Sequence, residues 1–355
     1  MDMAQAQERR GDAAALADIH RRWHRQSARV CLVLGLGLLA VACIAMLLGD
    51  YPASPSEILR SLLSPLTGEQ QPGVDFIVFQ LRLPRVVLAV LAGAAFGLAG
   101  TIFQTLLRNQ LASPDIIGIS YGASAAAVFC IMVLDLSGVA VGLGALVGAL
   151  LTLAAIYLLA WRNGISPYKI VLIGIAVGAM TMAFVSYLFT RARISEVQQA
   201  MGWLVGSLNG ANYEEIGLLG AALVVLVPIS LVLGRSLAAL ELGDDVARAV
   251  GSRVDMARVA LLATAVGLSA FATAAVGPLA FVAFMSGPIA RTAVGSGRGH
   301  MGATMLVGAL VVLVADLVAQ NALPGTQLPA GVVTGLLGAL MLMALLIKSN
   351  RRGSV

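Results

Sequence analysis

Long apolar runs, most of them close to 20 residues, recur from Val30 almost to the end of the chain. A helix needs about 20 apolar residues to cross the hydrocarbon core of a bilayer, whereas the strands of a membrane barrel alternate polar and apolar residues. These runs do not alternate. With 59% hydrophobic and only 12% charged residues, the sequence predicts an all-α, polytopic membrane protein.

Ten apolar segments can be distinguished, which predicts about ten transmembrane helices. The segments are 30–48, 86–107, 116–134, 139–160, 168–190, 216–234, 257–276, 278–292, 302–319 and 329–347. The first is longer than the apolar part of a cleaved signal peptide and no clear cleavage site follows it, so we expect a signal anchor. Residues 1–29 then form a polar N-terminal extension, and residues 348–355 form a short tail.

The arginines and lysines indicate the orientation. If both termini are cytoplasmic, 18 of the 23 basic residues lie in inner segments. The other five, in outer segments, are Arg60, Arg82, Arg85, Arg191 and Arg193. Because cytoplasmic loops carry an excess of positive charge, this distribution favours an even number of spans with both the extension and the tail in the cytoplasm.

Several chemistries are not expected. Neither Lys169 nor Lys348 completes a G-x-x-x-x-G-K-[ST] phosphate loop, so ATP hydrolysis by that route is excluded. The three histidines have no cysteine or carboxylate at ligand spacing, and no catalytic cluster is visible. The basic residues form no continuous face with interleaved aromatic residues. We therefore expect no enzyme, no metal site and no nucleic-acid partner.

Three acids lie near the predicted spans, namely Asp115, Asp135 and Asp316. A charge at membrane depth is costly and is often kept for ion coupling. Each of these acids also suits a helix boundary or a helix-packing position. An ion-coupled secondary carrier therefore stays open as an alternative.

The pentad Leu81-Arg82-Leu83-Pro84-Arg85 is predicted on the outer face, just before the second span. Proline fixes the backbone between the two arginines, so their guanidinium forks can bind carboxylates of another protein. Anchoring of a helix end at the interface is the simpler alternative. Farther along the chain, Trp203 and Tyr213 are also predicted to be interface anchors.

A polar stretch from Arg108 to Gly118 interrupts the apolar pattern on the inner side. Irregular backbone at membrane depth is tolerated where it is packed in protein or faces water. Asn109, Pro114 and Asp115 are therefore candidates for lining a translocation path. A tight turn between two spans is the alternative.

A short amphipathic segment follows the sixth span on the inner side. It comprises Leu242, Gly243, Asp244, Asp245, Val246, Ala247, Arg248, Ala249, Val250 and Gly251. We expect a two-turn helix that Asp244 caps and Gly251 ends. Leu242, Val246 and Val250 recur every four residues and form one apolar stripe. This stripe suits docking of a soluble partner, or contact with the membrane surface.

Five stretches, in order, resemble motifs of the type II ABC importer permeases that take up iron–siderophore complexes, vitamin B12 and haem. They are residues 81–85, 108–118, 242–251, 277–281 and 328–334. The resemblance extends over nearly the whole chain, from Val30 to Ile347. Residues 159–165, 206–210 and 315–320 are most similar to the G-type subunit of ferric-enterobactin permeases. Some relatives have a third docking arginine where this chain has Gln320.

The resemblance implies that residues 30–347 form a ten-span permease domain in the cytoplasmic (inner) membrane. Its cargo would be an iron–siderophore complex, with catecholates as a candidate class. Its partners would be a homologous second permease in a heterodimer, two copies of a cytoplasmic P-loop ATPase, an extracytoplasmic siderophore-binding protein and the lipid bilayer. ATP and Mg would be held by the ATPase, and this chain would bind no cofactor. A permease for vitamin B12 or haem is an alternative.

The resemblance also implies roles for individual residues. Arg82 and Arg85 would dock on acidic residues of the binding protein, and residues 242–251 would couple to the ATPase. An inner gate would lie in the turn between the fourth and fifth spans. It would comprise Ser166, Pro167 and Tyr168, in which proline fixes the turn and the tyrosine ring narrows the exit.

Overall fold

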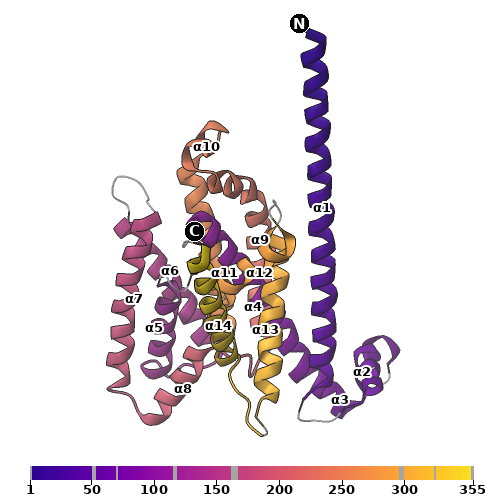
Figure 1. Ribbon diagram of the computed structural model, residues 1–355. Helices are drawn as coiled ribbons and strands as arrows, with labels where there is room; N and C mark the ends of the chain where they lie inside the picture. The colour runs from indigo at the N-terminus through magenta and orange to yellow at the C-terminus, as the bar shows by residue number, and fades with distance from the viewer. Residues whose placement is uncertain are drawn as a thin grey trace.

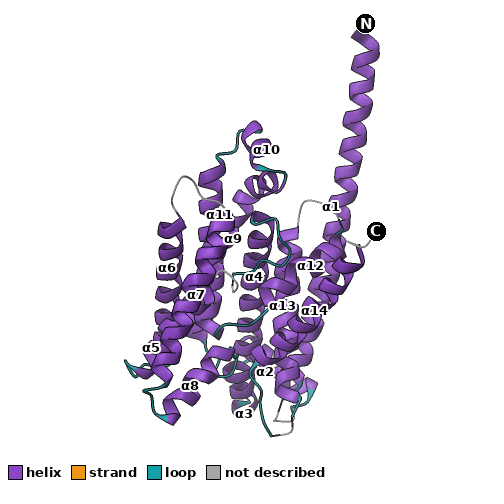
Figure 2. Cartoon of the chain, turned by 60° about the vertical axis from the view of Figure 1, so that its left-hand side comes forward, coloured by secondary structure: helices purple, strands orange, loops and turns teal. Residues whose placement is uncertain are grey.

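The computed structural model describes residues 2–49, 53–68, 71–114, 118–160, 167–295, 300–323 and 325–352. Within these ranges every named element is a helix, as Figure 2 shows, which confirms the all-α prediction. Ten helices coincide with the ten predicted spans. They are α1 (Asp2–Leu47), α4 (Leu83–Leu106), α5 (Ile119–Met132), α6 (Val139–Ala160), α7 (Pro167–Phe189), α9 (Tyr213–Glu241), α11 (Val254–Val276), α12 (Val282–Val294), α13 (His300–Asn321) and α14 (Ala330–Arg352).

Shorter elements connect these helices. They are α2 (Pro55–Thr67), α3 (Pro72–Phe76), the π-helical turn η1 (Ile77–Arg82), α8 (Ile194–Val205) and α10 (Asp244–Ala249). Among the described residues, eight helical stretches are long and apolar enough to cross a membrane. α5 and α12 have 14 and 13 residues and are shorter than a full crossing requires. Ten full crossings therefore remain a prediction.

The two ends of the helix bundle carry different elements. Figure 1 shows α10 at one end, together with the start of α1 and the end of α14, and shows α2, α3 and α8 at the opposite end. We call the α10 end the inner end and the opposite end the outer end, after the orientation that the basic residues predict. The start of α1 and the end of α14 thus lie at the same end of the bundle, as the prediction that both termini are cytoplasmic requires.

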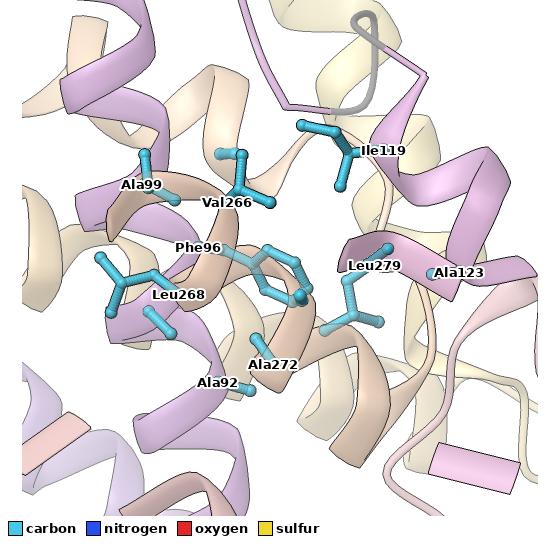
Figure 3. Close-up of a cluster of buried hydrophobic side chains, with 14 of the residues drawn as sticks. Ala92, Phe96, Ala99, Ile119, Ala123, Val266, Leu268, Ala272 and Leu279 are labelled. Atoms are coloured by element: carbon cyan, nitrogen blue, oxygen red, sulfur yellow. The ribbon is translucent and has the colours of Figure 1, made fainter. Parts of the chain in front are cut away.

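The core of the bundle is built around α4 and α11, the most buried of the long helices. α4 contacts α9, α11, α12 and α13, while α11 also packs on α5 and α6. Figure 3 shows the centre of this core, where Phe96 of α4 lies among side chains of α11 and Leu279 of the loop before α12. Both helices are apolar all round, as expected for helices enclosed by others.

Glycines allow α4 and α13 to approach closely. A Cβ atom at Gly93 would overlap the backbone of Gly308, and one at Gly97 would overlap the backbone of Thr304. Helices in lipid gain little from hydrophobic burial against one another, so such close backbone contact supplies much of their packing energy. These glycines therefore hold the core helix in place.

For two of the prolines inside helical segments, Pro84 and Pro288, distant side chains compensate for the missing N–H group. In η1 the N–H of Leu83 donates to the carbonyl of Val78, and Pro84 has no N–H to offer the next carbonyl, that of Phe79. The hydroxyl of Tyr213 donates to this carbonyl over 2.6 Å. A helix that contains proline is stable in a membrane where another group satisfies the freed carbonyl in this way.

The same arrangement recurs in α12. Pro288 cannot donate to the carbonyl of Phe284, and the Nε2 of Gln104 on α4 donates to this oxygen over 3.0 Å. Arg291 donates in turn to the Oε1 of Gln104 over 2.7 Å. Gly287 leaves room for the amide, because a Cβ there would overlap its oxygen. α12 is thereby fixed to the central helix.

Candidate functional site

At the inner end, α10 projects from the bundle as a short helix (Figure 1). It has six residues, and its N-cap is Gly243 with a φ of 122° and no side-chain cap. The expectation that Asp244 caps the helix is therefore wrong, because its carboxylate binds arginines instead. Gly251 follows the helix with a φ of 82°, consistent with its predicted role at the end.

The predicted apolar stripe of this segment faces outward. Leu242, Val246 and Val250 are 66%, 43% and 68% exposed, whereas Ala247 is completely buried against the rest of the chain. Val246 on α10, with Leu242 and Val250 in the turns on either side of it, forms an apolar surface that another protein can cover. Arg248 pairs with Asp245 over 3.2 Å on the polar side of the same helix.

Asp244 joins α10 to two other parts of the inner end. Its carboxylate accepts hydrogen bonds from Arg258 of α11 at 2.9 and 3.0 Å, and from Arg108 after α4 at 3.1 Å. Arg108 also donates to the carbonyl of Leu240 at the end of α9. We call Asp244, Arg108 and Arg258 the inner cluster. It links the ends of α4, α9, α10 and α11 through a single carboxylate.

Backbone and charge both support this cluster. Arg108 has a φ of 49°, in the left-handed region that favours glycine, and its guanidinium reaches α9 and α10 from this conformation. Partial burial alone would raise the pKa of Asp244. The hydrogen bond and charge of Arg258, with the charges of Arg108 and Arg248, outweigh this effect and lower the pKa below its usual value. Asp244 is therefore ionised at neutral pH.

The other inner candidates are only partly described. Asn109 is exposed, and its Oδ1 accepts a hydrogen bond from the N–H of Leu111, which is the geometry of a tight turn. Pro114 is buried, and Asp115 lies outside the described residues. Ser166 also lies outside them, and Pro167 with Tyr168 begins α7. Their path-lining and gating roles stay predictions.

At the outer end, Arg85 is held inside the bundle. Its Nε and NH2 donate to the two oxygens of Asp316 on α13, both over 2.8 Å, and its NH1 donates to Gln327 over 3.1 Å. Gln320 donates to the same carboxylate over 2.7 Å. The side chains of Arg85 and Asp316 are only 14% and 3% exposed. We call Arg85, Asp316, Gln320 and Gln327 the outer cluster.

Arg82 is also turned inward. It is 9% exposed and donates to the carbonyl of Met46 on α1 over 2.7 Å. The pentad is helical rather than a loop, because η1 contains Leu81 and Arg82 and α4 begins at Leu83. Both arginines therefore have partners within the chain. The prediction that their guanidinium groups bind carboxylates of another protein did not include these partners.

A cavity of about 530 Å³ lies beside the outer cluster. Arg82, Arg85, Asp316 and Gln320 contribute to its wall, with Asn209 from the 206–210 stretch. The neighbouring stretches meet through their backbones. The N–H of Ser207 donates to Val276 over 2.8 Å, and that of Gly331 donates to Gly206 over 3.1 Å. Four of the stretches singled out in the sequence, 81–85, 206–210, 315–320 and 328–334, thus converge at the outer end.

Of the three acids that could serve an ion-coupled carrier, the two within the described residues are not placed for that role. Asp316 is neutralised by Arg85, and Asp135 is exposed in the outer turn after α5. The described residues contain no group of three or more histidines, cysteines and acids that could hold a metal ion. Neither chemistry therefore gains support from the described geometry.

Comparison with known proteins matches residues 37–348 to the model of the FecCD transport family. The chain belongs to the FecCD transport family. It is 41% identical to the achromobactin transport system permease protein CbrC of Dickeya dadantii, over 91% of this chain and 92% of CbrC. It is 36% identical to the ferric enterobactin transport system permease protein FepG of Escherichia coli, over 92% of this chain and 98% of FepG.

A vitamin B12 import system permease protein, BtuC of Vibrio cholerae, is 32% identical over 94% of this chain and 99% of BtuC. A solved structure described as an inward-facing conformation of a metal-chelate type ABC transporter superposes with a TM-score of 0.78. It is 26% identical and covers 91% of this chain and 99% of its own. The FecCD-family chain is therefore a multi-pass membrane permease with the ABC permease fold, as the resemblance implied.

Proposed function

We propose that this chain is one permease subunit of an ATP-driven importer that carries an iron–siderophore complex across the cytoplasmic membrane. The relatives named for achromobactin and ferric enterobactin support this class of cargo, and the latter favours a catecholate complex. Vitamin B12 is the second candidate, because one relative is named for it. The iron arrives within its chelator, so the chain needs no metal ligands of its own.

The observation that carries this proposal is the exposed apolar stripe of α10 at the inner end. The chain lacks a phosphate loop, so ATP and Mg belong to a separate P-loop ATPase, and the stripe is the surface on which that ATPase docks. A homologous second permease and a second copy of the ATPase complete the assembly. ATP binding drives transport if the nucleotide binds more tightly to one permease conformation than to the other.

The test is uptake by proteoliposomes that contain both permeases, the ATPase and the binding protein. Val246→Asp places a charge in the docking surface, which costs a few kcal/mol when it is desolvated. We expect loss of ATPase binding and of uptake, while Val246→Thr, which keeps the side-chain shape, retains most of both. If Val246→Asp still binds the ATPase and transports, α10 is not the docking surface.

The cargo is tested in the same vesicles with iron loaded on a catecholate, a hydroxamate or citrate, and with vitamin B12. Preferred uptake of the catecholate complex supports the proposed class. Uptake of vitamin B12 alone would replace it with the second candidate. Uptake driven by an ion gradient without ATPase would overturn the importer assignment.

We also propose that Arg82 and Arg85 contribute to docking of the extracytoplasmic binding protein. Arg85 borders the outer cavity, where a carboxylate of the binding protein can take the place of Gln327 at NH1 while Asp316 keeps Nε and NH2. Gln320 provides no positive charge here, so these two arginines carry most of the attraction on this subunit.

The docking proposal requires a background without the Asp316 charge, since a glutamate at position 85 would otherwise face it. In Asp316→Asn, adding Arg82→Glu and Arg85→Glu should weaken binding of the binding protein, most strongly at low salt where screening is least. Asp316→Asn alone is the control. Equal affinity of both variants at every salt concentration would leave the arginines with a purely structural role.

The inner gate of Ser166, Pro167 and Tyr168, and path lining by Asn109, Pro114 and Asp115, are proposed from the resemblance. A cysteine at Ser166 and one in the matching turn of the partner permease should crosslink to different extents with and without ATP. Crosslinking that is independent of ATP would count against a gate.

A further inference from the structure

α2 is a well-defined helix outside the main bundle. Ser54 and Glu57 form a capping box at its start, in which Ser54 N–H donates to the Glu57 carboxylate over 2.8 Å and Glu57 N–H donates to the Ser54 hydroxyl over 3.3 Å. Gly68, with a φ of 75°, ends it. Local contacts thus specify both ends of this 13-residue helix.

The helix has three distinct faces. Ile58 and Ser61 are buried at 4% and 0% exposure and attach it to the chain. Leu59, Leu62 and Leu63, spaced by three and four residues, form an exposed stripe with exposures of 59%, 38% and 42%. Arg60, which is exposed, and Ser64, which is half-buried, lie on the third face, away from that stripe. An apolar stripe beside a polar face is typical of a helix that lies in a membrane interface.

Contacts with α1 and η1 set the depth of α2 in the molecule. Ile58 packs with Met46, in the last turn of α1, and with Val78 of η1. The Ser61 hydroxyl and the Gln71 N–H both donate to the Asp75 carboxylate, over 2.5 and 2.8 Å. Figure 1 shows α2 beside the outer end of α1. α2 therefore lies level with the end of the α1 apolar run.

The surroundings of this site identify what covers the leucine stripe. Only 6% of the most apolar part of α1, within Arg25–Leu47, is buried by the rest of the chain, so the bilayer covers most of this part of the helix. Near its outer end, Ile44 and Leu47 remain 44% and 38% exposed. The exposed stripe of α2 lies at the level of this lipid-facing end of α1. We propose that α2 is an interfacial helix whose Leu59, Leu62 and Leu63 insert into the outer leaflet of the bilayer.

This proposal does not depend on the cargo or on the ATPase. It gives α2 a mechanical role, since α2 contacts both the end of α1 and η1, the turn that carries Arg82. Anchored in the lipid, α2 holds this part of the outer end at a fixed depth.

The test uses nitroxide labels on single cysteines in the full-length chain, after replacement of Cys31, Cys43 and Cys130 by serine or alanine. The labels are placed at Leu59, Leu62 and Leu63, and at the polar positions Arg60 and Ser64. The chain is reconstituted into vesicles of phosphatidylethanolamine and phosphatidylglycerol. Accessibility to oxygen, which concentrates in lipid, is compared with accessibility to a water-soluble nickel chelate.

We expect the three leucine positions to be reached by oxygen and shielded from nickel, with the reverse at the two polar positions. The melting temperature of each labelled protein verifies its fold. Nickel access at all five positions would overturn the proposal. Shielding of the leucines that appears only after addition of the binding protein or of a second permease would also overturn it, and would make the stripe a protein-docking surface.

Discussion

The inner and outer clusters both join segments far apart in the sequence through an aspartate and arginines, yet their surroundings differ. In the outer cluster Asp316 is 3% exposed and Arg85 binds both of its oxygens at 2.8 Å. In the inner cluster Asp244 is 35% exposed and Arg108 is 48% exposed, and only Arg258, at 7%, is as buried as the outer pair. Water reaches Asp244 and Arg108 and reduces the cost of separating them, whereas in the outer pair both charges are shielded from solvent that could replace a lost partner.

This difference fits the docking roles that we propose for the two ends. The outer end packs its stretches through backbone hydrogen bonds and a buried ion pair, which suits a surface of constant shape. At the inner end, α10 is attached through the partly solvated carboxylate of Asp244, which has three arginines nearby. Small shifts of α10 can therefore occur while Asp244 still contacts an arginine. We therefore propose a structural role for the outer pair and a transmitting role for the inner cluster.

The largest effect is expected from breaking the outer pair. Asp316→Ala leaves Arg85 buried without its carboxylate and should destabilise the chain by about 3–5 kcal/mol. Replacing both partners, as Arg85→Met with Asp316→Leu, should restore most of the loss because no buried charge remains. Melting temperatures of the purified variants in detergent measure this. A double variant as unstable as the single one would show that the pair itself stabilises the fold.

A smaller effect is expected when the inner cluster loses its charge. Asp244→Asn keeps the side-chain size but removes the charge that Arg258 and Arg108 share. A hydrogen bond to a charged group is worth about 1.5–3 kcal/mol, so the attachment of α10 to α4 and α11 should loosen. Because the apolar stripe is unchanged, the ATPase should still bind, while the ratio of cargo transported to ATP hydrolysed should fall.

Asp245→Asn is the matched control for this prediction. It makes the same chemical change one residue away, at a fully exposed carboxylate whose partner is Arg248, and should leave coupling close to that of the parent. If both variants uncouple transport equally, the net charge of α10 matters and the inner cluster does not. If Asp244→Asn abolishes ATPase binding, Asp244 belongs to the docking surface.

Local sequence patterns predicted much of this architecture. The ten apolar runs gave the helices, and the four-residue spacing of Leu242, Val246 and Val250 gave the exposed stripe of α10. The same local reasoning assigned Asp244 to a helix cap, because a cap needs only neighbouring residues. The actual partners, Arg108 and Arg258, lie 136 and 14 residues away, and no periodicity connects them.

The prolines show a second limit of local reasoning. Pro84 and Pro288 each leave a carbonyl without its usual donor, which the sequence alone indicates. The groups that replace those donors, Tyr213 and Gln104, come from distant helices. Tyr213 was interpreted as an interface anchor because its phenol is amphipathic. A proline that leaves a carbonyl unsatisfied in a membrane helix is the sequence signal that predicts a donor from another helix.

Tyr213→Phe tests whether the outer end depends on this donor. Loss of the hydroxyl leaves the carbonyl of Phe79 without its donor and should cost about 1 kcal/mol, seen as a modest fall in melting temperature. Tyr187→Phe is the control, since its hydroxyl makes no hydrogen bond among the described residues and its ring still faces Arg191. Equal melting temperatures for the two variants would mean that water satisfies the Phe79 carbonyl.

The smallest effect is expected from pH at the inner cluster. Burial opposes ionisation of Asp244, but Arg258, Arg108 and Arg248 together lower its pKa in the folded protein. A carboxylate with a lowered pKa contributes its full stabilisation above the unfolded value, about 3.9, and loses it as pH falls through the folded value. The surrounding arginines stay charged throughout. The melting-temperature difference between the parent and Asp244→Asn should therefore be constant from pH 5 to 8 and should shrink only below about pH 4. A difference that already shrinks between pH 7 and 5 would mean that another titrating group controls the inner cluster.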